Sequence, residues 1–392
     1  MELDELKKLV RGGQFTAITL DTSIFDAQHL RLESGLLKQL EQFQNSSTKF
    51  LLSQVVKEEV LSHLINNTKE TRNKIEKDLK EAKKYWQVED YDIEVIKELI
   101  FVGREAQEIA SERFNQFVEL TSLEIIEAQS YVRIDDLIQK YFQAQPPFAN
   151  TGNKKNEFPD AIALMSLEGW ANENQTRIIV VTRDNDWKNF CKGSERLIDI
   201  DDLAAALGLF QLQDADDICK YLSERYEKGE LKDVKEAIYN ALQYHMSNIE
   251  ISPKASSAYY YEQESTEVIF NGFEFRLLET PNVIFRPVKL DNDGLVVESK
   301  LSINVNIEST FWFSVYDSID KDYVSMGSSS ENIPTNLDVN ILITFIGNLD
   351  KIGAEVEVDD VELETTVFKV NFGMIEPDWV DEDYDVDEDY DY

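Results

Sequence analysis

The chain has 392 residues, with 39 Lys and Arg against 76 Asp and Glu, which gives a formal charge of −37 and a pI near 4.4. With 42% hydrophobic and 11% aromatic residues it is too apolar for a disordered acidic chain, and its 15 Gly and 8 Pro do not fit a fibrous repeat. The length predicts two or three domains.

Hydropathy and cysteine usage exclude further classes. No apolar run approaches the roughly 20 residues of a membrane helix, and the start, MELDELKKLV, lacks the features of a signal peptide. We therefore expect a cytoplasmic protein without a membrane partner. Two Cys and three His are too few for a disulfide framework or a thiolate zinc site, so any metal has to be held by carboxylates.

The charge is unevenly distributed along the chain. Residues 1–210 contain 26 Lys and Arg against 36 Asp and Glu, whereas residues 211–392 contain 13 against 40. Because a polyanionic surface repels nucleic acid, we expect any nucleic-acid binding in the less acidic N-terminal half.

Strands and helices alternate from the N-terminus. Residues 15–21, FTAITLD, form an apolar run that ends in an acid, which predicts a buried strand with Asp21 at its C-terminal end. Apolar residues at helical spacing follow at 36–43, and residues 50–52 predict a second strand. Ser53 has the position of a helix N-cap.

A charged helical pattern without a strand signal covers residues 68–143, and we interpret it as a helical insertion. Its aromatic residues Tyr85, Trp86 and Tyr141 are expected in the core, with base stacking as the alternative. The polar stretch after Pro146-Pro147 separates this insertion from the next helix.

The remainder of the first half repeats the alternation. A helix is predicted to begin near Pro159, a residue suited to a first helical turn. Residues 177–182 and 197–200 predict strands, and residues 201–207 predict a helix. Strands that alternate with helices predict an α/β fold with a mostly parallel sheet.

The pattern changes after about residue 211. Residues 212–251 predict a helical connector, and residues 252–375 contain β-rich runs separated by Asn, Asp and Gly turns. We interpret the latter as an all-β, sandwich-like domain. Residues 376–392 contain no basic residue and predict a disordered acidic tail.

Four acids are expected to meet at one edge of the parallel sheet. Asp21 and Asp184 follow predicted strands, while Glu59 and Asp160 lie in the first turns of helices at the same edge. Clustered carboxylates repel one another unless a cation neutralises them, and hard oxygen ligands favour Mg²⁺ or Mn²⁺. These four are the candidate catalytic and metal-binding residues. Asp186 is a fifth candidate ligand, with a helix N-cap as its alternative role.

At these residues the chain resembles the PIN-domain nuclease family, in particular a bacterial subgroup with a long helical insertion. The resemblance covers residues 14–210 and rests on four motifs in order, with Ser23 standing where many members carry Asn. These motifs are DTS at 21–23, SQVVKEE at 53–59, EFPDAIAL at 157–164 and VVTRDNDW at 180–187. The resemblance implies a parallel α/β/α sandwich over residues 1–211, an acidic metal pocket and endoribonuclease activity.

Residues beside the acids are candidates for substrate binding. These are Ser23, Lys154, Lys155, Arg183 and Lys188. The basic side chains can hold phosphates on either side of the scissile bond, although lysines in polar loops are equally often only solvated. Ser23 is expected to support the site rather than to bind metal.

The sequence therefore predicts a metal-dependent phosphodiesterase that cuts RNA rather than DNA. A toxin or phage-defence role, a homodimer, and a regulatory partner bound through the β domain or the acidic tail are further hypotheses. Two alternatives stay open. One is a structure-selective DNA nuclease, and the other is a catalytically silent scaffold that binds RNA or protein.

Overall fold

The computed structural model describes residues 3–87, 89–148, 157–278, 283–349 and 355–378. The chain divides into two units, which are Met1–Cys219 with Arg286–Val297 and Lys220–Phe285 with Glu298–Tyr392. The first division lies inside the 212–251 stretch that the sequence assigns to a connector. None of the helices in the described ranges combines the length and apolar character that a membrane crossing requires.

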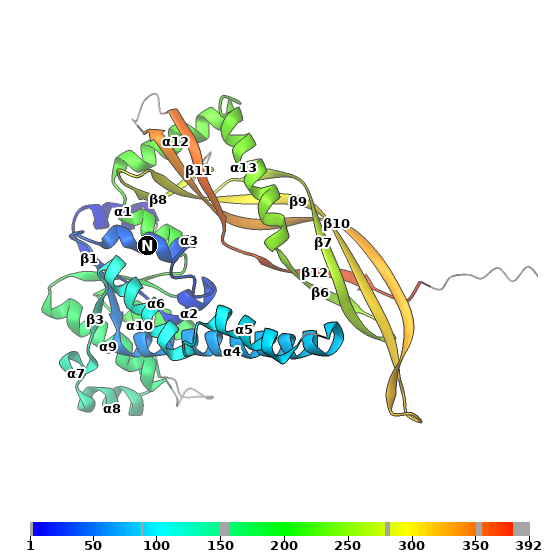
Figure 1. Ribbon diagram of the computed structural model, residues 1–392. Coiled ribbons are helices and arrows are strands. Elements are labelled where there is room, and N and C mark those ends of the chain that lie inside the picture. The colour runs from blue at the N-terminus through cyan, green and yellow to red at the C-terminus, as the bar shows by residue number, and fades with distance from the viewer. Residues whose placement is uncertain (1–2, 88, 149–156, 279–282, 350–354, 379–392) are drawn as a thin grey trace, which may run out of the picture. The chain divides into compact units, whose positions relative to one another are not determined.

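A five-stranded parallel sheet is the centre of the first unit (Figure 1). Its strands, in spatial order, are β3 (Glu124–Ile126), β2 (Lys49–Ser53), β1 (Phe15–Leu20), β4 (Arg177–Val181) and β5 (Leu197–Ile200). All neighbouring strands pair in parallel, and β1 and β4 end together, because Leu20 lies opposite Val181. The predicted α/β fold with a parallel sheet is confirmed.

Strand β3 was not expected from the sequence, which gave residues 68–143 no strand. It pairs with β2, with Leu51 opposite Glu124 and Ser53 opposite Ile126. The strand has three residues, so alternation cannot be recognised in it, and one of the three is charged. The helical insertion therefore returns to the sheet before it ends.

Two groups of helices cover the sheet. The helices of the first unit are α1 (Leu3–Arg11), α2 (Thr22–Ala27), α3 (Gly35–Lys38), η1 (Gln39–Phe43), α4 (Gln54–Trp86), α5 (Asp90–Phe101), α6 (Ala106–Thr121), α7 (Ala128–Tyr131), α8 (Ile134–Phe142), α9 (Phe158–Glu173), α10 (Asn185–Gly193) and α11 (Leu203–Leu209). Helices α1 and α11 pack on each other and against β1 and β4, whereas α9 packs against β2 to β5 together with α4, α7 and α10. The core between them contains fully buried Ile18, Leu51 and Ile179.

Helix α4 is a single helix of 33 residues. It begins after Ser53, whose hydroxyl oxygen accepts a hydrogen bond from the backbone N–H of Val56 at 3.2 Å, as the sequence predicts for an N-cap. Only its first third is buried in the core, and α5 and α6 pack against the remainder. The insertion thus begins as a continuation of α4.

The aromatic residues of the insertion differ from expectation. The side chains of Tyr85 and Trp86 are 72% and 83% exposed at the end of α4, so the prediction that they lie in the core is wrong. Tyr141 packs against the rings of Phe148 and Phe158, with centroids 5.4 and 5.0 Å away, as expected for a core aromatic.

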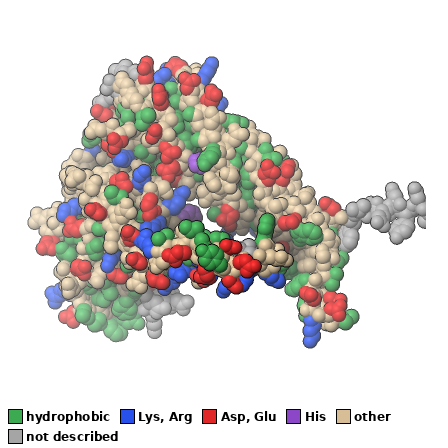
Figure 2. Space-filling view, in the orientation of Figure 1, with side chains coloured by type: hydrophobic (Ala, Val, Ile, Leu, Met, Phe, Trp, Pro, Cys, Tyr) green, Lys and Arg blue, Asp and Glu red, His purple; other side chains and the backbone are tan. Residues whose placement is uncertain are grey.

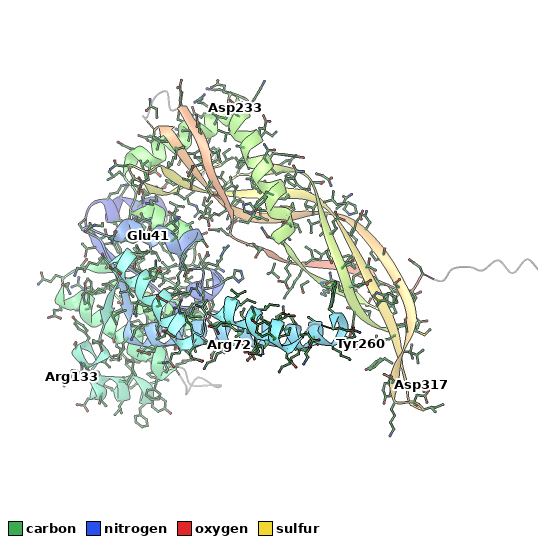
Figure 3. The ribbon with its side chains drawn as sticks, viewed as in Figure 1. Glu41, Arg72, Arg133, Asp233, Tyr260 and Asp317 are labelled. Carbon is green, nitrogen blue, oxygen red and sulfur yellow. The ribbon has the colours of Figure 1, made fainter. Side chains whose placement is uncertain are left out.

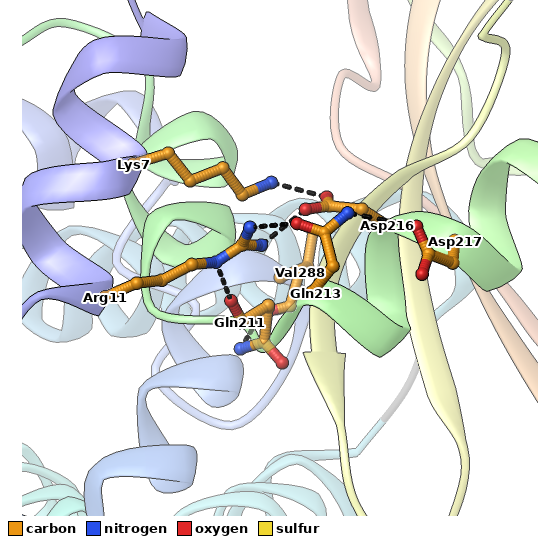
Figure 4. Close-up of polar contacts among 7 residues, drawn as sticks. All are labelled: Lys7, Arg11, Gln211, Gln213, Asp216, Asp217 and Val288. Atoms are coloured by element: carbon orange, nitrogen blue, oxygen red, sulfur yellow. Dashed lines mark hydrogen bonds and ion pairs between the residues drawn. The ribbon is translucent and has the colours of Figure 1, made fainter.

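Residues beyond the parallel sheet complete the first unit. Lys7 and Arg11 of α1 form ion pairs with Asp216, and the Arg11 Nε donates to the backbone oxygen of Gln211 at 3.0 Å (Figure 4). Asp216 lies in α12 (Gln213–Glu227). These contacts hold the start of α12 against the N-terminal helix.

The segment Arg286–Val297 also belongs to this unit. Its strand β8 (Arg286–Leu290) packs on α11 and continues through a turn into β9 (Leu295–Asp317). The Gln211 side chain donates to the backbone oxygen of Val288 at 3.1 Å. A Cβ added at Gly208 would lie 2.8 Å from the backbone oxygen of Pro287, so only glycine allows this close approach.

The second unit is β-rich, which confirms the predicted all-β region. Its long antiparallel sheet has the order β11 (Glu355–Leu363), β10 (Asp322–Asn348), β9 and β7 (Tyr260–Arg276), and a parallel pair is formed by β12 (Val367–Met374) and β6 (Glu250–Ser256). The helices are α12, α13 (Lys232–His245) and η3 (Met246–Asn248). Figure 3 marks Asp233 on α13, Tyr260 at the start of β7 and Asp317 at the end of β9.

The two sheets of this unit meet through aromatic side chains. Phe311 of β9 and Phe372 of β12 have ring centroids 5.2 Å apart, and both are buried. Along β9, alternate residues such as Ile303, Val305 and Ile307 are buried, as expected for a strand with one covered face. Of the predicted acidic tail, residues 379–392 lie outside the described residues.

Candidate active site

The site candidates lie at the edge where β1, β2 and β4 end. Asp21 follows β1 directly, and its backbone N–H donates to the Val181 carbonyl at the end of β4 at 3.0 Å. The strand order reverses between β1 and β4, because the chain passes from β1 to β2 on one side and reaches β4 on the other. Such a switch point is where open parallel sheets bind ligands.

Asp21 is the most enclosed of the acids, with 5% of its surface exposed. Its Oδ2 accepts hydrogen bonds from the hydroxyls of Ser23 at 2.5 Å and Thr182 at 2.9 Å. Burial raises the pKa of Asp21, the two hydrogen bonds lower it, and the negative charges of Asp184 and Asp160 raise it, with a net increase. No donor in the described residues reaches its Oδ1, so that oxygen is available to a ligand.

Glu59 lies in the second turn of α4, not in the first as the sequence predicted, because the helix begins at Gln54, and it is half-buried. The Thr22 hydroxyl donates to its Oε2 at 2.6 Å, which ties α4 to the start of α2. The neighbouring Glu58 has a 59% exposed side chain and forms an ion pair with Lys57 instead. Glu59 is therefore the acid of this pair that lies beside Thr22 and Asp160 at the candidate site.

Asp160 lies in the first turn of α9, where the preceding Pro159 stands at one of the first two helical positions. The indole N–H of Trp187 donates to its Oδ1 at 2.9 Å. Burial raises the pKa of Asp160, this hydrogen bond lowers it, and the charges of Asp184, Glu59 and Asp186 raise it, with a net increase.

Asp184 is the N-cap of α10, and not Asp186 as the alternative reading proposed. Its Oδ1 accepts from the backbone N–H groups of Asp186 at 2.6 Å and Trp187 at 3.1 Å. Asp186 lies in the first turn of α10. The cap uses one oxygen of Asp184, and no donor in the described parts of the chain reaches the other.

The carboxylates act on one another electrostatically, since the charges of the other acids contribute to the raised pKa values of both Asp21 and Asp160. Their oxygen atoms are the donors that Mg²⁺ and Mn²⁺ prefer. In the described part of the chain, however, no three or more His, Cys, Asp or Glu side chains are arranged as a metal site. Carboxylate oxygens suit a hard divalent cation, but the described side chains do not converge on a single point as the ligands of a bound ion do.

A comparison with protein families fits this geometry. Residues 18–187, which contain all five acids, match the family model of the PIN domain. This part of the chain belongs to the PIN-domain nuclease family. No curated protein and no solved structure matches the chain. PIN domains are generally nucleases, so the acidic edge of the sheet is the candidate active site.

The predicted substrate-binding residues of the PIN domain have different surroundings. The Ser23 hydroxyl is bonded to Asp21, and Arg183 is exposed, with its backbone N–H 3.4 Å from the Ser23 hydroxyl. Lys188 forms an ion pair with Asp201 at 3.3 Å. Lys154 and Lys155 lie outside the described residues.

Three site residues were missed by sequence reasoning. Thr22 and Thr182 donate to Glu59 and Asp21, and Trp187 donates to Asp160. Each of the three lies in a motif that also contains Asp21 or Asp184. Closeness in sequence to these acids was therefore the feature from which their position at the site could have been predicted. Thr182 also accepts a hydrogen bond from the Asp184 backbone N–H at 3.0 Å and so joins the two strand-end acids.

Proposed function

We propose that the PIN domain is a divalent-metal-dependent endoribonuclease, with Asp21, Glu59, Asp160 and Asp184 as the residues that hold the metal. The observation that supports this most directly is that acids from separate elements meet at the switch point of the sheet, where Thr182 joins Asp21 to Asp184 and Trp187 of α10 donates to Asp160. Ionised carboxylates this close together destabilise the fold, which favours a role that requires them.

The residues of this chain have separate roles in the proposal. Asp21 and Asp160 direct carboxylate oxygens to the site, and Ser23, Thr182 and Trp187 fix their orientation. Thr22 does the same for Glu59. Asp186 is proposed as an additional ligand at the start of α10.

PIN nucleases usually use Mg²⁺ or Mn²⁺. When bound, such an ion would lower the pKa of a water molecule and stabilise the negative charge of the transition state and leaving oxygen. Arg183 is the exposed basic residue of the described site and is proposed to bind a phosphate beside the scissile bond. The preference for RNA over DNA follows from the resemblance to the family.

The proposal is tested with end-labelled single-stranded RNA and DNA of the same sequence in Mn²⁺, Mg²⁺ or EDTA. Wild type is expected to cut RNA internally with metal only, and Asp21→Asn and Asp160→Asn are expected to lose at least a hundredfold in rate, on the order of the electrostatic contribution of one site group. Glu58→Gln is the matched control and is expected to keep full activity. Cleavage in EDTA, or unchanged cleavage by both Asn variants, would contradict the proposal.

A further inference from the structure

Helix α4 connects the candidate active site to a basic surface. Its outer part, residues 69–84, contains seven Lys and Arg against four Asp and Glu, in a chain of net charge −37. Figure 2 shows basic and acidic side chains along this part of the molecule, with apolar side chains over α5. A local positive surface is what an acidic protein requires to bind a nucleic acid.

Five lysines of this helix share one face with Glu59, together with the acids Glu70 and Glu81, so the face is net positive. Lys77 is 18 residues from Glu59, which is five complete turns, so the two side chains leave the helix in the same direction. Lys69, Lys74, Lys80 and Lys84 leave it within about 80° of that direction, and Glu70 and Glu81 within about 40°. All five lysines are exposed. Because α4 is one continuous helix, the metal-site acid and the lysines form a single line along it.

The lysines are largely free to bind a ligand. In the described residues no carboxylate lies within ion-pair distance of Lys69, Lys80 or Lys84, and Lys77 has only a long contact of 3.9 Å with Glu81. Arg72, labelled in Figure 3, is different, because it stacks 4.9 Å over the Phe101 ring and pairs with Glu76 on the side of α5. The available charge is therefore concentrated on the face away from α5.

The far end of the line carries exposed aromatic rings. Tyr85 and Trp86 end the helix, and Tyr91, which is 78% exposed, lies in the first turn of α5. Lys84 lies 4.8 Å over the Tyr85 ring. Exposed aromatics beside lysines are typical of surfaces that bind single strands, since each unpaired base can stack on a ring.

We propose that the face of α4 formed by Lys69, Lys77, Lys80 and Lys84 binds the backbone of single-stranded RNA and guides it to the acidic edge. At a rise of 1.5 Å per residue, Lys69 lies about 15 Å and Lys84 about 38 Å from Glu59 along the helix. RNA of a few nucleotides reaches only the active site, whereas a longer strand also contacts the lysines and bases stack on Tyr85 and Trp86. The choice of RNA rests on the proposed function.

The test compares two triple variants of the full chain that change the net charge equally. Lys77→Gln/Lys80→Gln/Lys84→Gln removes the proposed contacts, and Lys228→Gln/Lys232→Gln/Lys235→Gln removes exposed lysines of the second unit. Gln has nearly the helix propensity of Lys, and circular dichroism checks that α4 is retained. Affinity is measured by fluorescence anisotropy with a labelled 20-nucleotide RNA in EDTA.

The α4 variant is expected to bind this RNA about tenfold more weakly, as three exposed charge contacts imply. The slope of log affinity against log salt should fall by about two, at roughly 0.7 per phosphate contact. The control variant should bind like wild type. Equal loss in both variants, or no loss in the α4 variant, would overturn the proposal.

Further arms separate this inference from the proposed function and from other partners. Mn²⁺-dependent cleavage of a five-nucleotide RNA should be unchanged in the α4 variant, because a stacked strand of about 17 Å ends before Lys77, the nearest substituted lysine, which lies about 27 Å from Glu59 along the helix. If wild type binds the long RNA through these lysines but cuts no RNA, the nuclease proposal fails and the binding face remains. If wild type binds no RNA but self-associates, and Leu99→Ser on the exposed apolar side of α5 abolishes that association, then the outer part of α4 and α5 form a protein-contact surface and the inference is overturned.

Discussion

The Trp187 indole N–H donates to the Asp160 carboxylate, with 2.9 Å between Nε1 and Oδ1. Trp187 is 1% exposed and lies in α10, whereas Asp160 begins α9. One buried ring thus fixes the orientation of a candidate metal ligand from a different helix. The same ring belongs to the core, so the position of the ligand depends on the packing of the domain.

Replacing Trp187 by Phe is predicted to raise the pKa of Asp160 further, because the hydrogen bond that lowers it is lost while the burial remains. The variant should also lose about 1–2 kcal/mol of unfolding free energy from the hydrogen bond and the smaller ring. Carboxyl ¹³C NMR in EDTA, with the Asp160 signal assigned by Asp160→Asn, measures the titration. Trp170→Phe, a second buried Trp of the same domain, should lose stability without shifting this titration.

Removing a charge from the acidic edge is predicted to stabilise the metal-free protein at neutral pH. The pKa values of Asp21 and Asp160 are raised in the folded protein. The stabilisation that protonation of these groups gives the fold is therefore fully present below the ordinary Asp pKa and is lost as the pH rises through their folded-state pKa values. In EDTA at pH 7, Asp160→Asn should therefore melt about 2 °C above wild type. The difference should vanish below the ordinary Asp pKa, and Glu58→Gln should show no gain at either pH. A lower Tm for Asp160→Asn than for wild type at pH 7 would contradict the repulsion between the carboxylates of the acidic edge.

Divalent metal is predicted to reverse this repulsion. Mn²⁺ at a hundredfold excess over its Kd should stabilise wild type by about 2.7 kcal/mol, and EDTA should remove the gain. Differential scanning fluorimetry over a Mn²⁺ series measures the shift in Tm. Asp21→Asn and Asp160→Asn should require much higher Mn²⁺ concentrations. An identical Mn²⁺ response in wild type and both variants would place the ion elsewhere.

Loss of the N-cap of α4 is predicted to affect both stability and the site. Ser53→Ala removes the acceptor for the Val56 N–H, which should cost about 1 kcal/mol in urea unfolding. Because Glu59 lies in the second turn of the same helix, cleavage should slow as well. Ser53→Gly should cost only a few tenths of a kcal/mol, since glycine is an acceptable cap. Equal losses of unfolding free energy in Ser53→Ala and Ser53→Gly would argue against a stabilising N-cap at Ser53.

The positions of the candidate acids were predictable from the sequence because parallel strands end at one edge. Asp21 and Asp184 each follow an apolar, β-branched run, and this pattern identifies a buried strand and its last residue together. The positions of Glu59 and Asp160 followed from helix starts marked by Ser53 and Pro159. These signals are local, so they need no knowledge of long-range packing.

Features that depend on distant contacts were not predictable. Strand β3 is defined by its pairing with β2, and its three residues carry no pattern of their own. The donation from Trp187 to Asp160 joins residues 27 positions apart and depends on how α9 and α10 pack. Trp86 is exposed because no element of the described chain covers it. An aromatic residue in a charged helix does not indicate whether another element will cover it.

The ion pairs of Lys7 and Arg11 with Asp216 have a consequence for isolating the first unit. A fragment that ends at residue 211 would leave both cations of α1 without their partner. A fragment that ends at Cys219 would still lack β8 and would uncover the buried apolar residues of α11 on which it packs. The first unit therefore spans two separate stretches of the chain, and excising it requires joining Arg286–Val297 to residues 1–219 through a new linker rather than a single cut.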